Sequence, residues 1–232
     1  MVATRRVQLY TCASTQINMD AVFAEFARIT AALATPSRLK LLDRLCQGEQ
    51  TVDQLAESTG LNVPNASRHL RLLAECRLAA VRRDPPYVYY RVAGEDVVKF
   101  WFALRDLARG QLAEIDRIVA DLVGGPEPLV PLRRDELIAR MSTGEVLLVD
   151  VRPEPEFRAG HIRGAISVPL EALEARLAGM TPDRAIVAYC RGPYCMLAVD
   201  AVRALRARGF QAVRLEDGFP EWKAAGLPVE AA

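Results

Sequence analysis

The chain has 232 residues, of which 51% are hydrophobic and 25% charged, and its formal net charge is +1 at pH 7. The length suits one large or two small globular domains, and the near-neutral charge excludes a basic field over the whole surface as the means of binding nucleic acid. The first residues contain no apolar core of signal-peptide length, and no stretch approaches the ~20 apolar residues of a membrane span. We therefore expect a cytoplasmic protein without membrane contact.

After a predicted tail of residues 1–17, apolar residues recur at helical spacing from Met19 to Leu33. A second helix begins at Thr35-Pro36-Ser37 and stops at Gly48. A third helix covers residues 51–60, and a fourth begins near Pro64. Two short helices joined by a tight turn predict a helix-turn-helix.

Residues 79–92 contain two β-prone runs around Asp84-Pro85-Pro86, which predicts a hairpin. Residues 95–123 are predicted to form one long helix, whose apolar stripe is close to a coiled-coil seam. A Gly-Gly pair and three prolines within residues 121–131 indicate a domain boundary. We therefore predict an N-terminal domain of residues 18–123, a linker of residues 124–131 and a C-terminal domain of residues 132–232.

Polar and basic side chains cluster at the start of the fourth helix, where they can reach base edges and phosphates in a major groove. From residue 65 to 91 there are six arginines and two acidic residues, so this stretch can supply a local phosphate-binding patch. A merely solvated helix face is the weaker interpretation of the whole unit. The predicted DNA-binding residues are Asn65, Ser67, Arg68, His69, Arg71, Arg82 and Arg83.

Beyond the boundary, strands alternate with helices. The strands are V-L-L-V-D-V, I-V-A-Y and A-V-R-L, and an amphipathic helix lies between the last two. This βαβ order predicts a largely parallel sheet. The predicted fold class is thus two domains: a mostly α winged helix-turn-helix, followed by an α/β domain with helices on both faces of a parallel sheet.

The second strand ends at Cys190, and R-G-P-Y-C then leads directly into the helix. Backbone N–H groups and the helix dipole favour an anion at such a loop, so the pKa of the Cys190 thiol should fall there. A buried structural cysteine is the weaker interpretation. The candidate catalytic residues are Cys190, Arg191, Gly192, Tyr194 and Cys195.

The remaining cysteines, Cys12, Cys46 and Cys76, complete an odd count of five at scattered spacings. That pattern predicts no disulfide framework, and without a C-x-x-C pair and with two histidines it predicts no metal site and no cofactor. These three are candidate sensor thiols, although packing residues are the better interpretation of Cys46 and Cys76 because their surroundings are apolar.

The N-terminal domain resembles the ArsR/SmtB family of winged helix-turn-helix repressors. The similarity lies in A-T-P-S-R-L-K-L-L, in T-V-D-Q-L-A-E-S-T-G-L-N-V-P-N-A-S-R-H-L-R-L-L and in V-R-R-D-P-P-Y-V-Y-Y-R-V. It implies a homodimer that pairs through the first and last helices of this domain and binds a double-stranded DNA operator. The family's metal ligands are missing, so metal sensing is not expected.

The C-terminal domain resembles the rhodanese domain, through L-L-V-D-V-R-P-E-P-E-F, G-H-I-R-G-A-I-S-V-P, Y-C-R-G-P-Y-C-M and L-E-D-G-F-P-E-W-K-A-A-G-L-P-V. The resemblance implies that Cys190 takes sulfane sulfur from a small donor such as polysulfide or thiosulfate and holds it as a persulfide. It assigns structural roles to Asp150, Arg152, His161 and Gly164. A phosphatase is disfavoured because Met196 stands where the C-x5-R pattern needs arginine.

Cys195 either resolves a Cys190 persulfide into a bridge or merely fills the first turn of the helix; the sequence leaves both open. The two domains together predict a transcriptional regulator, expected to be a repressor, whose rhodanese domain senses or transfers sulfane sulfur. The alternative is a sulfurtransferase enzyme for sulfur transfer or detoxification, with DNA binding independent of the sulfur state.

Overall fold

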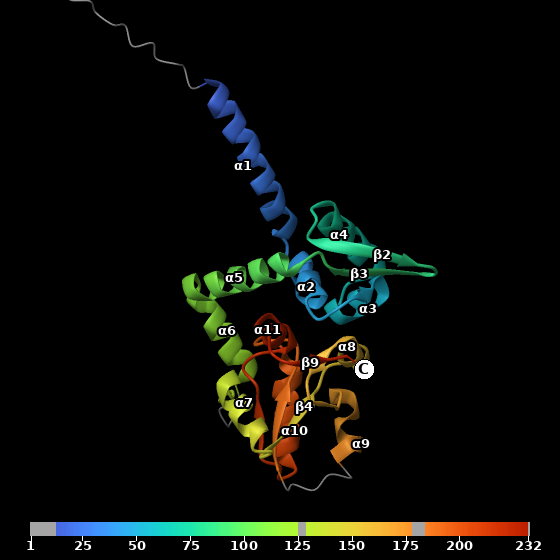
Figure 1. Cartoon of the computed structure of the whole chain (residues 1–232), viewed down its shortest axis with the longest axis vertical. Coiled ribbons are helices and arrows are strands. Elements are labelled where there is room, and N and C mark those ends of the chain that lie inside the picture. Colours follow the sequence, from blue (N-terminus) through green and yellow to red (C-terminus); the bar gives the residue numbers. More distant parts are fainter. Residues whose placement is uncertain (1–12, 125–128, 178–183, 232) are drawn as a thin grey trace, which may run out of the picture.

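In the computed structural model, an N-terminal helical unit lies against a C-terminal α/β unit, and the first helix projects away from both (Figure 1). The structure describes residues 13–124, 129–177 and 184–231. Cys12 and the centre of the predicted linker lie outside these residues.

The N-terminal unit has the predicted helices and hairpin, and a short strand, β1, pairs with β3. Thr51 and Gln54 form a capping box at the start of α3, and the Asn62 side chain accepts a hydrogen bond from the Asn65 backbone N–H at the start of α4. The elements are α1 (Ala13–Leu33), α2 (Pro36–Leu45), β1 (Gln50–Thr51), α3 (Val52–Thr59), α4 (Val63–Glu75), β2 (Ala79–Asp84) and β3 (Tyr87–Val92).

The prediction of one helix over residues 95–123 is wrong. The structure has two helices, α5 (Glu95–Gln111) and α6 (Ala113–Val123), separated by Leu112 in an extended conformation. Gly110 weakens the last turn of α5. The bend brings the end of α6 onto α10 (Met196–Ala207), where Val123 packs against the C-terminal core. There, Arg203 Nη2 donates to the carbonyl oxygens of Val123 and Gly124, both at 2.7 Å.

The C-terminal unit is built on a four-stranded parallel sheet of order β6-β4-β7-β8. A separate two-stranded ladder pairs β5 with β9. Besides α10, the elements are α7 (Arg134–Ser142), β4 (Val146–Asp150), α8 (Glu154–Ala159), β5 (His161–Ile162), β6 (Ile166–Ser167), a 3-10 helix (Leu170–Ala172), α9 (Leu173–Leu177), β7 (Ala185–Tyr189), β8 (Ala212–Arg214), α11 (Phe219–Ala224) and β9 (Val229–Glu230).

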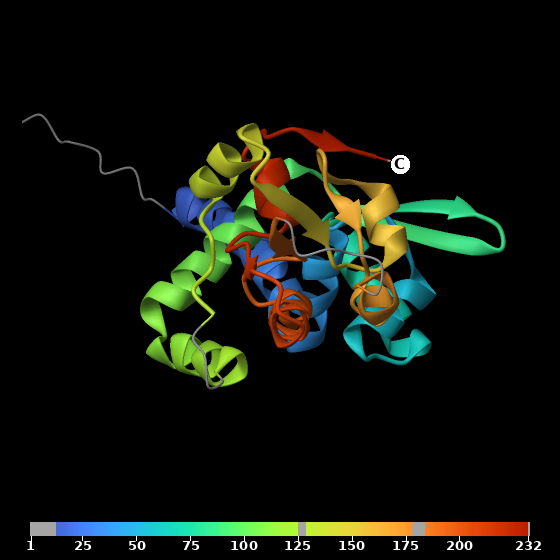
Figure 2. The same ribbon diagram turned by 90° about the horizontal axis from the view of Figure 1, so that it is seen from below.

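Both faces of this sheet are covered, as predicted. Alternate residues of β4 and β7 pack into two different apolar clusters, because side chains of a strand point to opposite faces in turn. One cluster includes α10, and the other includes Leu137 of α7 and Trp222 of α11. Figure 2 shows β4 between α7 and α11 on one side and α9 and α10 on the other.

Among the residues that the structure describes, no helix is long and apolar enough to cross a membrane. In the same residues, no group of three or more His, Cys, Asp or Glu side chains is placed to hold a metal ion.

Candidate functional site

The loop between β7 and α10 brings Cys190 and Cys195 together. Cys190 follows the last residue of β7 and is only 2% exposed, while Cys195 is half-buried and is the N-cap residue of α10. The side chains of Cys190 and Cys195 are hydrogen-bonded to each other, and Cys190 Sγ also donates to the Cys195 carbonyl oxygen at 3.5 Å. Backbone N–H groups also point at both sulfurs: those of Gly192 and Ala198 at Cys190, and those of Arg191 and Leu197 at Cys195.

The sequence predicted a lowered pKa for Cys190, but the lowered pKa is that of Cys195. Burial raises the pKa of the Cys190 thiol well above its usual value. The pKa of Cys195 is lowered to about 6, chiefly because of its side-chain hydrogen bond with Cys190 and also because of the backbone N–H groups and Arg191. The two shifts have opposite directions: burial disfavours the charged form of Cys190, whereas hydrogen bonds favour the charged form of Cys195.

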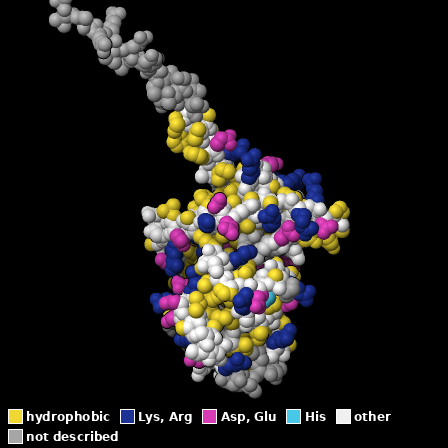
Figure 3. All heavy atoms as spheres, in the orientation of Figure 1, with side chains coloured by type: hydrophobic (Ala, Val, Ile, Leu, Met, Phe, Trp, Pro, Cys, Tyr) yellow, Lys and Arg dark blue, Asp and Glu magenta, His cyan; other side chains and the backbone are white. Residues whose placement is uncertain are grey.

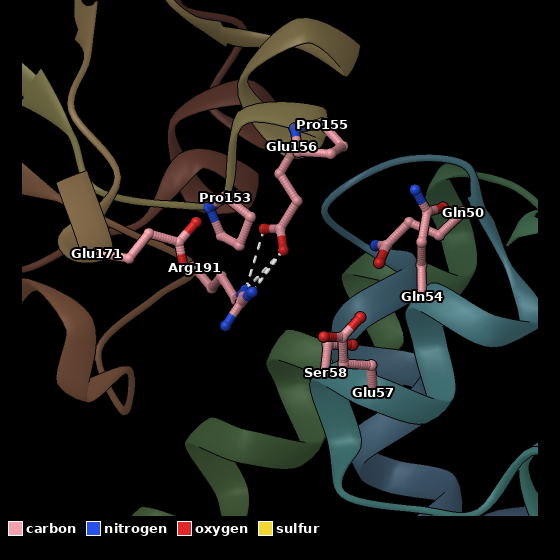
Figure 4. A pocket seen from close by; sticks show the side chains of 9 residues that line it. All are labelled: Gln50, Gln54, Glu57, Ser58, Pro153, Pro155, Glu156, Glu171 and Arg191. Carbon is pink, nitrogen blue, oxygen red and sulfur yellow. Dashed lines mark hydrogen bonds and ion pairs between the residues drawn. The ribbon is translucent and has the colours of Figure 1, made fainter.

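Arg191 does not point its guanidinium at the sulfurs. Its Nε and Nη2 bind the carboxylate of Glu156 on α8 at 2.5 to 3.0 Å, and both side chains are buried. Figure 4 shows this pair at the edge of a pocket of about 320 Å³, across which the side chains of α3 lie. Glu57 and Glu171 also line that pocket, whereas Cys190 and Cys195 do not.

Gly192 is tightly enclosed. Its φ of +150° disfavours other residues, and the backbone of Gly218, just before α11, lies against it. A Cβ atom on Gly218 would overlap backbone atoms of Arg191 and Gly192. Tyr194, by contrast, is 41% exposed. The loop is thus fixed on its inner side and open at Tyr194.

The residues given structural roles by the resemblance lie beneath this loop. Asp150 and Arg152 are both fully buried and form an ion pair at 2.6 Å, and Arg152 also donates to the Gly160 carbonyl oxygen at 2.7 Å. His161 stacks on Phe157, and its Nδ1 lies 3.0 Å from the Phe157 carbonyl oxygen. Because these contacts use the side chains within the fold, neither Arg152 nor His161 is placed to act on the sulfurs.

The predicted DNA-binding residues lie on α4 and on the β2–β3 hairpin. Basic side chains gather there, at the end of the N-terminal unit away from the C-terminal unit (Figure 3). Ser67, Arg71 and Arg83 line one groove between α4 and the hairpin. The other side of α4 has a hollow lined by Asn65, Arg68, His69 and Arg71. Arg38 also lines this hollow, and the sequence did not predict it as a DNA-binding residue.

Two of these residues have altered electrostatics. Arg82 binds Glu49 at 2.7 Å and Asp84 at 3.1 Å, so its charge is partly neutralised. The pKa of His69 is lowered, first by desolvation and then by Arg68 and Arg38, which favours its neutral form.

The candidate sensor thiols Cys46 and Cys76 lie in the N-terminal unit, outside the loop between β7 and α10. Cys76 is 6% exposed within the N-terminal core. Cys46 is half-buried, and burial raises its pKa to about 12. Burial therefore disfavours the thiolate of Cys46, and Cys12 lies outside the described residues.

Sequence comparisons agree with both halves of this arrangement. Residues 35–81 match the family model of bacterial regulatory proteins of the arsR family, and residues 133–225 match the rhodanese-like domain. An HTH-type transcriptional regulator of Mycobacterium tuberculosis, Rv0324, is 47% identical over 90% of this chain and 92% of its own length. The chain belongs to the arsR family of regulators. It carries a rhodanese-like domain after its winged helix-turn-helix.

Shorter relatives match one half of this arsR-family regulator each. A probable mercury resistance operon repressor of Streptomyces lividans is 37% identical over 39% of this chain and 72% of its own length. A sulfurtransferase of Allochromatium vinosum is 32% identical over 38% of this chain and 82% of its own length.

The loop between β7 and α10, residues 190–195, contains both cysteine sulfurs and is named the sulfur loop. Some residues at this loop of the arsR-family regulator were not predicted from the sequence. Glu156, which binds Arg191, and Gln47 and Arg105 from the N-terminal unit all contact the loop or its supports. Glu156 falls within a quoted rhodanese motif, P-E-P-E-F, which was a signal for it. Nothing near Gln47 or Arg105 in the sequence marks them.

Proposed function

We propose that this regulator is a homodimeric repressor whose affinity for its operator changes when Cys190 takes up sulfane sulfur. The observation that carries the proposal is the pair of hydrogen-bonded thiols within one loop of converging N–H groups. Such a loop stabilises anionic sulfur, whether as thiolate or as the outer atom of a persulfide.

The two thiols can divide the chemistry of loading. The Cys195 thiolate accepts the Cys190 proton across their hydrogen bond, and Cys190 then attacks the sulfane sulfur of a donor. With thiosulfate, the new S–S bond forms on Cys190 while the bond to the sulfonate sulfur breaks and sulfite leaves. With a polysulfide, a shorter polysulfide leaves.

Cys195 can then resolve the persulfide. Once it loses its proton, its thiolate attacks the inner sulfur of the Cys190 persulfide, the two cysteines become bridged, and hydrosulfide leaves. The sulfane sulfur is the oxidant, since it is reduced to sulfide as the two thiols are oxidised. No other oxidant is required.

The test is operator binding at fixed salt, with the DNA upstream of the gene as probe. Reduced, polysulfide-treated and thiosulfate-treated protein are compared, and mass spectrometry follows the peptide that contains both cysteines. We expect affinity to fall about 5- to 150-fold in step with sulfur on that peptide, the range of typical coupling energies. Cys190→Ser should bind DNA normally and not respond, while Cys195→Ser should accumulate the persulfide without bridging.

A Cys190→Ser variant that responds like the wild type would contradict the mechanism. If sulfur loads onto Cys190 while DNA affinity stays constant, the rhodanese-like domain is instead a sulfurtransferase that shares a chain with a repressor.

A further inference from the structure

The peptide group between Arg191 and Gly192 is held from both of its sides. Its N–H group, on Gly192, points at the Cys190 sulfur. Its carbonyl oxygen, on Arg191, accepts a hydrogen bond of 2.9 Å from the side chain of Gln47. Because a peptide group is planar, the direction of the carbonyl fixes the direction of the N–H. Gln47 therefore orients one of the donors to the reacting sulfur.

Gln47 belongs to the DNA-binding domain, where it lies between α2 and α3. It is 1% exposed, and both ends of its amide are used across the boundary between the domains. Besides its bond to Arg191, its Oε1 accepts from Arg152 Nη1 at 3.4 Å. A buried amide with both ends bonded is costly to displace, because either end would lose its partner away from water.

Arg105 of α5 reaches the same peptide from another direction. Its Nη2 binds Glu221 Oε1 at 2.7 Å, and both side chains are about 10% exposed. Glu221 accepts from the Gly218 backbone N–H at 3.0 Å, and Gly218 lies directly against Gly192. The Arg105 guanidinium also lies over the Tyr194 ring, 5.7 Å from its centroid.

We propose that the DNA-binding domain supplies two positioning residues to the sulfur loop, Gln47 for the Arg191–Gly192 peptide and Arg105 for Glu221 and Tyr194. The proposal rests on the proposed function. An added sulfur atom on Cys190 enlarges the group that the Gly192 N–H must serve, so the peptide has to turn. That turn strains the bond to Gln47, and the strain enters the DNA-binding domain at the segment between α2 and α3.

The first test does not depend on sulfur chemistry. In the full-length protein, the rate of alkylation of Cys190 and Cys195 by iodoacetamide is followed against pH by mass spectrometry. Gln47→Met keeps the size of the side chain but loses both hydrogen bonds, whereas Gln47→Glu keeps only the acceptor for Arg152. The matched control is Gln50→Met, since buried Gln50 donates to Arg44 within its own domain.

We expect Gln47→Met and Gln47→Glu to move the pH midpoint of Cys190 alkylation upward, because the Gly192 N–H is no longer held toward the Cys190 sulfur. Alkylation of Cys190 at pH 7 should slow about 3- to 10-fold, the size of one net hydrogen bond. Loss of stability alone would not explain a shifted alkylation midpoint in a Gln47 variant, because the midpoint is measured on folded protein. Gln50→Met, which also removes a buried hydrogen bond, should show no shift.

The second test measures operator affinity of the same proteins before and after polysulfide treatment. Gln47→Met should load sulfur but show a ratio of loaded to reduced affinity near 1. Arg105→Gln should also bring this ratio closer to 1, while Arg109→Gln, one turn further along α5 and paired with exposed Asp116, should leave the ratio at its low wild-type value.

Wild-type midpoints and a wild-type ratio in Gln47→Met would overturn this inference. A different result, in which wild-type protein itself shows no affinity change on loading, would overturn the proposed function; the positioning role of Gln47 is then decided by the alkylation midpoints.

Discussion

At the scale of single residues, Cys190 and Cys195 have different tasks set by their places in the loop. Cys190 is enclosed by the core of the C-terminal unit, so its charged form is penalised. Cys195 is at the N-terminus of a 12-residue helix, where the helix dipole and free N–H groups favour an anion. The two environments therefore favour the neutral thiol at Cys190 and the thiolate at Cys195.

This division predicts the pH dependence of thiol reactivity. The pKa of Cys195 is depressed to about 6, so its thiolate is present above that pH and is lost as the pH falls through it. Alkylation of Cys195 should then reach half its maximal rate near pH 6. Cys190→Ala removes the largest cause of the shift, so the midpoint should rise toward the ordinary cysteine range near 8.5. A midpoint unchanged in Cys190→Ala would contradict the hydrogen bond between the thiols.

The sequence was sufficient to find both cysteines because the loop is contiguous and its motif is local. It was not sufficient to decide which thiol ionises, because that depends on burial and on which sulfur donates to which. The contacts that hold the loop were missed for a related reason. Glu156 is 35 residues from Arg191, and Gln47 is 144 residues away. Only the tertiary structure brings them together.

At the scale of elements, the arginines of the predicted DNA-binding surface differ in how far carboxylates already neutralise their charge. Ser67, Arg71 and Arg83 line an open groove, whereas Arg82 is occupied by Glu49 and Asp84 and stacks on Tyr89 at 4.1 Å. An arginine that is already paired with carboxylates attracts a phosphate less strongly. The hairpin therefore presents Arg83 as its stronger phosphate contact.

Salt dependence of operator binding can test this difference. Each phosphate contact contributes about 0.9 to the slope of log affinity against log salt concentration. Arg83→Gln should lower the slope by about that amount, and Arg82→Gln should lower it by clearly less. Arg133→Gln, on an exposed side chain of the C-terminal unit, is the control and should leave the slope unchanged. Equal losses for Arg82→Gln and Arg83→Gln would show that the Glu49 pair opens on DNA.

The elements also show where sequence patterns mislead. Three of the four strands of the sheet, the helix-turn-helix and the hairpin were predicted correctly because each has a clear period and turn residues at its ends, whereas the two-residue strand β6 was not predicted. The break at Leu112 was missed because the apolar spacing continues through it. The bend is stabilised by the packing of Val123 on α10 and by the hydrogen bond from Arg203 to the Val123 carbonyl oxygen. Both α10 and Arg203 belong to the C-terminal domain. The apolar periodicity of one segment does not reveal which distant segment packs against it.

At the scale of the whole molecule, the DNA-binding surface and the sulfur loop lie on opposite sides of the α2–α3 segment. In Figure 1, α4 and the hairpin are at the far side of the N-terminal unit, and the C-terminal unit is below α2 and α3. The rhodanese-like domain therefore leaves α4 uncovered. The proposed control of DNA binding would therefore act through the arrangement of the N-terminal unit, or through the relation of two copies in the proposed dimer, rather than by blocking the surface.

The proposed homodimer would bury apolar surface, and two exposed apolar surfaces are available for it, on α1 and in the groove between α5 and α6. Phe23 and Phe26 are 59% and 61% exposed on α1, and apolar side chains of α1 form a patch in Figure 3. Trp101, Leu104 and Ile118 line an almost wholly apolar groove of about 430 Å³ that also includes Tyr194 of the sulfur loop. Apolar surfaces of this kind on a regulator favour burial between subunits.

We expect the double variant Phe23→Asp, Phe26→Asp to be monomeric by size-exclusion chromatography with light scattering, because four aspartates would have to be buried in the dimer. Operator affinity should fall more than tenfold, since a dimer engages two half-sites through one molecule. Glu25→Gln is the control: it removes only the exposed ion pair with Arg28 on the same helix, and such pairs contribute about 0 to 1 kcal/mol. A double variant that remains dimeric with wild-type affinity would exclude α1 from the dimer contact.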